Sequence, residues 1–317
     1  MNRRAWTLLF ILGAIWGASY LFIEIGLRDF SPGMIAWLRV ALGAAVLLVL
    51  AGSRGALSGF AGRAWTLIAL GAIQVAGPFV LIAAGQQEIS SSLAGILVTS
   101  APLFTALLAI WVDQQERSQG SRLAGLLVGV AGVGVLLGVD LGGEAEQLLG
   151  AFAVILAGLG YAVGGLIVKH RLAAHPPIGA AAWIVTASTV LLAPVAVIGF
   201  PAQAPGLGPV AAVIALGAVG TGVAFTILYG LIATVGPART WIVTYLAPGF
   251  AVVYGVTLLD ETITLATITG LGLILAGSWL AAGGRLSRGR PSSPVVAAGL
   301  PGGSAGPLHR RAHRESS

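Results

Sequence analysis

Residues 102–132, PLFTALLAIWVDQQERSQGSRLAGLLVGVAG, recur in outline as residues 248–277, PGFAVVYGVTLLDETITLATITGLGLILAG. Each stretch opens with a proline inside a long apolar segment, and a glutamate follows 14 positions after Pro102 and 13 positions after Pro248. In both stretches a glycine comes nine positions after that glutamate, and another comes seven positions later. Internal self-similarity of this kind indicates a duplicated structural unit.

The likeness extends upstream at a constant offset. The segment 16–20, WGASY, lies 145 positions before the segment 161–165, YAVGG, and Pro32 lies 145 positions before Pro177. A duplicated helical bundle is typical of secondary transporters, in which the binding site lies between the two repeats.

The composition indicates that lipid surrounds most of this chain. Only 9% of the 317 residues are charged and 57% are hydrophobic, whereas a soluble domain carries about 25% charged residues. The length allows about ten spans of about 20 residues with short connections, and it leaves no room for a sizeable soluble domain. The chain has no cysteines, which excludes disulfides, thiolate metal sites and cysteine nucleophiles.

We predict an all-α integral membrane protein with ten transmembrane helices. The predicted ranges are 6–26, 32–51, 65–85, 90–111, 121–138, 149–169, 178–199, 207–231, 239–259 and 265–284. With the amino end in the cytoplasm, every Lys and Arg except Arg28 and Arg39 falls in a cytoplasmic segment. The positive-inside rule therefore predicts that both termini are cytoplasmic. Because each half has an odd number of spans, five, the second repeat is inverted relative to the first.

The predicted organisation is a first repeat over residues 1–138, a second repeat over residues 149–284 and a cytoplasmic tail over residues 285–317. The tail is rich in Gly, Pro, Ser and Arg and lacks the apolar content to fold, so we predict that it is disordered. The net charge of +6 is spread over loops and tail rather than one face. This pattern indicates attraction to anionic lipid, not to nucleic acid.

These features resemble the drug/metabolite transporter superfamily, specifically its ten-helix proteins with two EamA domains. The residues that carry the likeness are the segment 16–20, Pro32 with Arg39, Pro102 with Glu116, and Pro248 with Glu261, Gly270 and Gly277. The resemblance implies a carrier of small metabolites in a bacterial inner membrane, often an exporter of amino acids or related compounds. It also implies a central cavity lined chiefly by the first, third, fourth, sixth, eighth and ninth helices. Members often carry Lys eight residues after the Trp, where this chain has Glu24, while the matching position of the second repeat is Lys169.

Glu24 and Arg39 are the ionisable residues that we place inside spans. A charge in the membrane costs a few kcal/mol or more, so such groups face the bundle interior and find partners. Glu24 is a candidate to bind a proton or a cationic substrate group; the alternatives are an ion pair with Arg39 or contact with water at the outer surface. Arg39 has either a structural role or a role as a substrate anchor.

Pro102 and Pro248 each remove a backbone donor within an apolar helix, so we predict kinks that serve packing and act as hinges beside the cavity. The candidate substrate-binding residues are aromatic or polar side chains on the predicted cavity helices: Trp16, Tyr20, Gln74, Ser100, Tyr161, Phe225, Tyr229, Trp241 and Tyr245. Aromatic surfaces suit amphipathic organic substrates. Single aromatic or polar residues in spans also serve packing between helices.

The glycines of the fifth helix, from Gly125 to Gly138, and of the tenth, from Gly270 to Gly277, predict surfaces for close helix packing. They are candidates for a homodimer interface, and tight packing within one chain is the alternative. Glu116 and Glu261 recur at helix ends, which suggests capping or loop closure.

The sequence indicates no catalytic or cofactor chemistry. The four histidines show no metal-ligand spacing, and no Walker phosphate loop or dinucleotide-binding glycine motif occurs. We therefore expect no metal and no cofactor. The leading hypothesis is a secondary transporter, an exporter of small organic metabolites that works by alternating access around a central cavity. The alternatives are a non-transporting membrane subunit or sensor, or a membrane enzyme acting on lipid-linked substrates.

Overall fold

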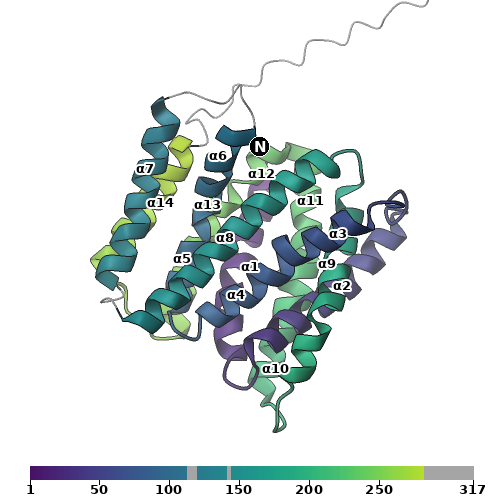
Figure 1. Ribbon diagram of the computed structural model, residues 1–317, viewed down its shortest axis with the longest axis horizontal. Helices are drawn as coiled ribbons and strands as arrows, with labels where there is room; N and C mark the ends of the chain where they lie inside the picture. The colour runs from purple at the N-terminus through teal and green to yellow at the C-terminus, as the bar shows by residue number, and fades with distance from the viewer. Residues whose placement is uncertain (113–119, 141–143, 282–317) are drawn as a thin grey trace, which may run out of the picture. The chain divides into compact units, whose positions relative to one another are not determined.

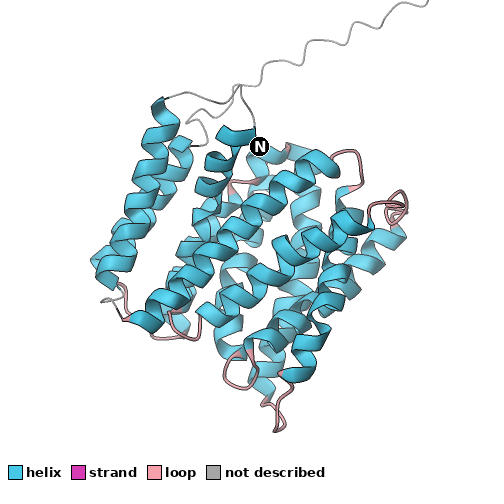
Figure 2. Ribbon diagram, viewed as in Figure 1, coloured by secondary structure: helices cyan, strands magenta, loops and turns pink. Residues whose placement is uncertain are grey.

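The computed structural model describes residues 1–112, 120–140 and 144–281, and these residues form helices and connecting loops with no strand (Figure 2). The predicted tail at 285–317 and Glu116 lie outside the described residues.

The described residues of the first half form ten helical elements. They are α1 (Arg3–Gly26), α2 (Pro32–Ser53), α3 (Ala64–Leu70), η1 (Gly71–Ala76), α4 (Gly77–Gly85), α5 (Ser91–Leu97), η2 (Val98–Ser100), α6 (Ala101–Val112), α7 (Gly120–Val135) and η4 (Leu136–Asp140). The second half continues with α8 (Ala145–Arg171), α9 (Pro177–Ile198), α10 (Leu207–Ile214), η5 (Ala215–Val223), α11 (Ala224–Val235), α12 (Pro237–Thr240), α13 (Val243–Leu258) and α14 (Leu265–Ala281).

Among the described residues, seven helical stretches are long and apolar enough to cross a membrane: Arg3–Gly26, Pro32–Ser53, Ala64–Gly85, Ser91–Leu108, Ala145–Arg171, Pro177–Ile198 and Leu207–Val235. Three shorter apolar helices cover Leu123–Gly138, Val243–Leu258 and Leu265–Ala281. Every predicted range overlaps one of these stretches. Large apolar side chains such as Leu127 and Val197 are exposed on the outside of the bundle, where lipid would cover them.

Local sequence explains where several helices begin. The Ser31 hydroxyl accepts a hydrogen bond from the Met34 N–H (3.3 Å), and Pro32 occupies the first turn of α2. At α5 the hydroxyl of Ser90 accepts from the N–H of Leu93 (3.2 Å). A hydroxyl at this position satisfies a backbone donor that the helix itself leaves free, and proline fits the first turn because it has no N–H to satisfy.

Each half of the chain packs against the other through equivalent helices (Figure 1). The fifth and tenth helical stretches, α7 and α14, lie side by side, as do α2 and α9. α1 packs on α13, and its counterpart α8 packs on α6. α2 contacts η5, and its counterpart α9 contacts η1. The contact pattern is therefore preserved when the two halves are exchanged.

The connecting segments gather at the two ends of the bundle. The N–H of Gly206, between α9 and α10, donates to the Asp29 carboxylate after α1 (2.7 Å). At the other end of α2, the Trp183 indole donates to the Leu57 carbonyl (3.0 Å). The segments after α1 and α9 thus lie together at one end of α2, and the segment after α2 lies at the other end beside α9.

The α7–α14 pair forms a seam of glycines. A side chain at Gly125 would meet the Gly277 carbonyl at 2.7 Å, and one at Gly132 would meet the Gly270 carbonyl at 2.9 Å. The two backbones are in direct contact, so only glycine fits. Gly134 and Gly272, by contrast, face open space. The predicted close packing therefore occurs within the chain, and the predicted homodimer through these helices stays a prediction.

Two helices carry π-helical segments at matching positions. The segment η1 begins at Gly71 and η5 begins at Ala215, 144 positions later. π-Helical turns are rare and occur often at functional sites. In α9, the hydroxyl of Ser188 donates to the Gly71 carbonyl (3.0 Å), which ties the start of η1 to the other half.

Candidate functional site

A small cavity of about 90 Å³ lies between the two halves of the chain. Its lining residues are Trp16, Ser19, Tyr20, Ile23, Arg39, Ile82, Val98 and Tyr161. They come from α1, α2, α4, η2 and α8, so both halves contribute. We call this space the central cavity. Four of the predicted residues, Trp16, Tyr20, Arg39 and Tyr161, meet there.

Arg39 is the one basic side chain in the lining of the central cavity, and it is 8% exposed. Its Nε donates to the hydroxyl of Thr221 in η5 (3.2 Å), and its guanidinium lies 3.8 Å from the ring centroid of Phe79 in α4. A buried cation is stabilised by such a hydrogen bond and by the negative face of an aromatic ring. The π-helical segment of the eighth helical stretch thus supplies a direct partner for the intramembrane arginine.

Neither Thr221 nor Phe79 was among the sequence-predicted site residues. The sequence predicts that a buried arginine needs a partner, but several Thr and Phe residues were possible partners for Arg39. The position of Thr221 between Gly220 and Gly222 is a signal of close backbone approach that sequence reasoning could have used.

Glycines determine how α1 and α8 present their aromatic side chains. A Cβ at Gly17 would meet the Ala247 carbonyl at 2.8 Å, so this face of α1 lies directly on α13. Trp16 and Tyr20 project from other positions of the same helix into the central cavity. On α8, a side chain at Gly164 would collide with Gln74, and Tyr161, three residues earlier, lines the central cavity.

The other predicted substrate-binding residues do not line the central cavity. Gln74 lies against α8, and Ser100 is 2% exposed and faces Gly158. Phe225 and Tyr229 pack against buried apolar clusters, and their ring centroids lie 6.2 Å apart. Trp241 is 49% exposed, and Tyr245 is half-buried.

The predicted hinge prolines occupy two different settings. Pro102 is the second residue of α6, directly after the 3₁₀ turn η2 that ends α5. Pro248 lies inside α13 and is buried, while the break in that stretch falls before it, between α12 and α13. Both stretches are interrupted near their prolines, and the hinge role stays a prediction.

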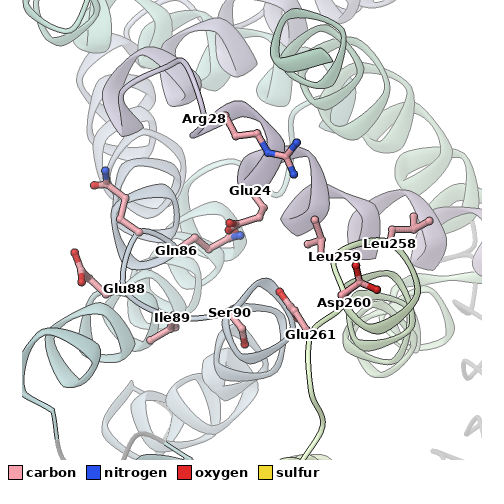
Figure 3. Close-up of a pocket in the computed structure, with 11 residues that line it drawn as sticks. Glu24, Arg28, Gln86, Glu88, Ile89, Ser90, Leu258, Leu259, Asp260 and Glu261 are labelled. Atoms are coloured by element: carbon pink, nitrogen blue, oxygen red, sulfur yellow. The ribbon is translucent and has the colours of Figure 1, made fainter. Parts of the chain in front are cut away.

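A second, larger pocket of about 480 Å³ opens at one end of the bundle (Figure 3). Its lining residues are Glu24, Arg28, Gln86, Gln87, Glu88, Ile89, Ser90, Leu258, Leu259, Asp260 and Glu261. We call it the acidic pocket, because its ionisable side chains are four carboxylates and one guanidinium. Glu24 faces this pocket, with Arg28 as the nearby cation, and does not form an ion pair with Arg39.

Glu261 joins the two halves of the chain at the rim of the acidic pocket. Its carboxylate accepts hydrogen bonds from the backbone N–H of Ser91 (2.8 Å) and of Ser92 (3.0 Å) and from the hydroxyl of Ser92. A carboxylate at a helix N-terminus satisfies free N–H groups and complements the helix dipole. Glu261 therefore caps α5, which confirms the expected capping role for this residue.

The chain matches the sequence profile of the EamA-like transporter family twice, over residues 4–138 and 148–283. It is 27% identical to a probable terminal-alkyne amino-acid exporter of Streptantibioticus cattleyicolor, over 92% of this chain and 98% of the relative. It is 28% identical to the uncharacterized inner membrane transporter YedA of Escherichia coli, over 91% and 93%. A probable amino-acid metabolite efflux pump of Salmonella typhimurium is 27% identical, over 88% and 95%.

A protein of known crystal structure shares the fold, with a TM-score of 0.63 and 22% identity over 89% of this chain and 97% of that chain. The relatives are named as transporters or exporters, not as enzymes. Together with its apolar helices, these matches identify the chain as a multi-pass membrane protein. Because the family profile covers most of its length, the chain belongs to the EamA-like transporter family of the drug/metabolite transporter superfamily.

Proposed function

We propose that this protein is a secondary transporter that exports a small organic metabolite, such as an amino acid, across a bacterial plasma membrane. In this proposal ten spans form two inverted five-helix repeats, both termini are cytoplasmic, and the substrate binds in the central cavity. Alternating access then comes from rocking of one repeat against the other.

The observation that carries the proposal is the lining of the central cavity. Trp16, Tyr20 and Arg39 come from the first half, and Tyr161 comes from the second. A site shared between repeats changes its access when the repeats move, because each repeat carries part of the lining. The segments after α1 and α9 lie at one end of α2 and the segment after α2 lies at the other, which agrees with the proposed succession of spans.

The side chains of the central cavity suit an amphipathic substrate with a carboxylate. A guanidinium binds carboxylates through its planar set of donors, and the aromatic rings offer apolar surface with a polar edge. Two relatives are named for the export of amino acids or their metabolites, which agrees with this chemistry.

The size of the central cavity requires a conformational change. Sites for small molecules usually measure about 300–1,000 Å³, whereas the central cavity measures about 90 Å³. A metabolite therefore enters only after the helices separate. In the proposed cycle, this narrow state lies between an inward-open and an outward-open state.

Transport is tested with the full chain in proteoliposomes. A thermal-shift screen of amino acids and other metabolites selects ligands, which are then assayed for counterflow of radiolabelled compound. We expect Tyr161→Ala to reduce the flux at least about fivefold, the scale of one lost aromatic contact. Tyr254→Ala is the matched control, because Tyr254 lines neither the central cavity nor the acidic pocket.

Two outcomes would contradict the proposal. One is equal flux in the two tyrosine variants, which would place the substrate elsewhere. The other is an absence of counterflow for every ligand that stabilises the folded protein. That result would favour a binding or sensing role without transport.

A further inference from the structure

The acidic pocket is adjacent to the central cavity along one face of α1. Trp16, Tyr20 and Glu24 are spaced four residues apart in α1, so each lies near the next on the helix surface, about 6 Å further along the axis, and Arg28 follows just after the helix ends at Gly26. Trp16 and Tyr20 line the central cavity, whereas Glu24 and Arg28 line the acidic pocket. A solute that leaves the central cavity along this face of α1 therefore meets Glu24 within one helical turn.

Gln86 connects the two spaces and is 4% exposed. Its amide nitrogen donates to the backbone carbonyl of Tyr20 (3.0 Å). A carbonyl only accepts hydrogen bonds, so this contact fixes the orientation of the amide. Figure 3 shows the ends of the Gln86 and Glu24 side chains next to each other in the pocket. The backbone of α1 therefore holds the Gln86 amide in place.

Two acceptor oxygens of this pair lack donors. Oε1 of Gln86 and Oε2 of Glu24 are both buried atoms that lack a hydrogen-bond donor among the described residues, although the Gln86 side chain interacts with the Glu24 carboxyl. A buried acceptor left without a donor costs about 1–3 kcal/mol, and more if it is charged. Buried polar atoms are nearly always satisfied in proteins, so these two oxygens indicate a ligand that brings hydrogen-bond donors.

The charge of the pocket selects the kind of donor. Its carboxylates belong to Glu24, Glu88, Asp260 and Glu261, and its one guanidinium belongs to Arg28. Glu261 is engaged in capping α5, so the carboxylate that remains beside Gln86 is that of Glu24, which is half-buried and has one buried oxygen. An anionic group would be repelled here. An ammonium group carries a positive charge and three donors, which matches both the charge and the missing hydrogen bonds.

A metal ion is a weaker match. Calcium and magnesium take six or more oxygen ligands, and the described residues contain no group of three or more acidic or histidine side chains arranged to hold a metal ion. The volume of about 480 Å³ also exceeds what a bare ion needs and lies in the range of small organic ligands.

We propose, resting on the transport function proposed above, that Glu24 and Gln86 form an outer subsite that binds the ammonium group of the substrate. The substrate class is then a small amine or amino acid, which passes from the central cavity to the acidic pocket during export.

The probe for this subsite is n-butylammonium chloride, which carries an ammonium group and an apolar tail but no carboxylate. We expect it to raise the unfolding temperature of the purified full-length protein in a saturable manner. Sodium butyrate and sodium chloride at equal ionic strength produce no such shift. Glu24→Gln keeps the size of the side chain and removes its charge, and we expect it to raise the Kd at least tenfold, which is about 1.4 kcal/mol.

Two further variants separate binding from folding. Glu146→Gln removes an exposed carboxylate in the first turn of α8, outside both the acidic pocket and the central cavity, and leaves the Kd within twofold of the wild type. Glu24→Asp keeps the charge on a shorter side chain and gives an intermediate Kd, so it measures the effect even if Glu24→Gln does not fold. Equal binding of n-butylammonium to the wild type and the Glu24 variants, or a shift with sodium chloride of the same size, would overturn the subsite.

The counterflow assay distinguishes this proposal from the function on which it rests. If the wild type carries metabolites without amines, and Glu24→Gln carries them equally well, the subsite is wrong and the transport function stands. If n-butylammonium binds through Glu24 but no compound is carried, the subsite stands and the transport function is wrong.

Discussion

Arg39 illustrates how one residue links the two halves of the molecule. Its Nε in α2 donates a hydrogen bond to the Thr221 hydroxyl in η5, and its guanidinium stacks over the ring of Phe79. Thr221→Val keeps the shape of the side chain but leaves the Arg39 Nε without its acceptor. An unsatisfied buried donor costs about 1–3 kcal/mol. We therefore expect a clear fall in the unfolding temperature of the detergent-solubilised protein.

Thr226→Val is the matched control for this prediction. Thr226 lies one turn further along the same stretch, and its hydroxyl bonds only to the carbonyl of Gly222 in its own helix (3.0 Å). We expect little change in unfolding temperature, because no other side chain loses a partner. An equal effect of the two substitutions would show that Arg39 does not depend on Thr221.

At the scale of elements, the start of α5 depends on a carboxylate from the other half. Glu261→Gln retains one acceptor oxygen, loses the charge and leaves one of the N–H groups of Ser91 and Ser92 without its partner. Loss of a helix cap costs about 1 kcal/mol, which is a factor of about five in a local equilibrium. We expect amide hydrogen exchange at residues 91–93 to accelerate by that factor.

Asp260→Asn provides the comparison within the same loop. Asp260 has a left-handed backbone with φ 56°, a conformation that asparagine also adopts readily. The substitution removes one negative charge next to Glu261 without removing a cap. Unchanged exchange at residues 91–93 in this variant, with faster exchange in Glu261→Gln, would assign the effect to the cap. Faster exchange in both variants would indicate a general electrostatic effect.

The elements differ in how well the sequence predicts them. Hydrophobicity predicted the apolar stretches, and signals such as Ser31 with Pro32 predicted where helices begin. Both kinds of signal depend only on residues that are close together in the sequence. The π-helical segments could not be predicted from the sequence, because a run such as 215–223 has the same apolar composition whether its turns are α or π. The acceptor of Arg39 was hard to predict, because 182 residues separate Arg39 from Thr221 and only the glycines on either side of Thr221 mark that position.

At the scale of the whole molecule, the proposed topology places residues 54–63 in the cytoplasm and residues 199–206 outside. The chain has no cysteines, so a single introduced cysteine is the only thiol of the protein that the reagent can label. Ser58 and Gln203 are both exposed in their loops. In intact cells, we expect a membrane-impermeant maleimide to label Gln203→Cys and to spare Ser58→Cys until the membrane is permeabilised.

The reverse labelling pattern would place both termini outside, and labelling of both residues in intact cells would contradict the proposed succession of spans. The sequence predicts this arrangement from the distribution of Lys and Arg, a property of the whole chain that needs no knowledge of contacts. It did not predict which of the candidate site residues meet. Trp16, Tyr20, Arg39 and Tyr161 line the central cavity while Trp241 is exposed, because helix rotation decides which face points inward.

The glycine seam between α7 and α14 also has a consequence for biosynthesis. About 130 residues separate Val135, where α7 ends, from Leu265, where α14 begins. A ribosome adds roughly 5–20 residues per second. The interval between the synthesis of α7 and that of α14, whose backbone packs against the glycines of α7, is therefore on the order of ten seconds. During that interval Gly125 and Gly132 face lipid or the insertion machinery. A nascent chain that stops before α14 therefore exposes an unfilled groove that cellular quality control can recognise.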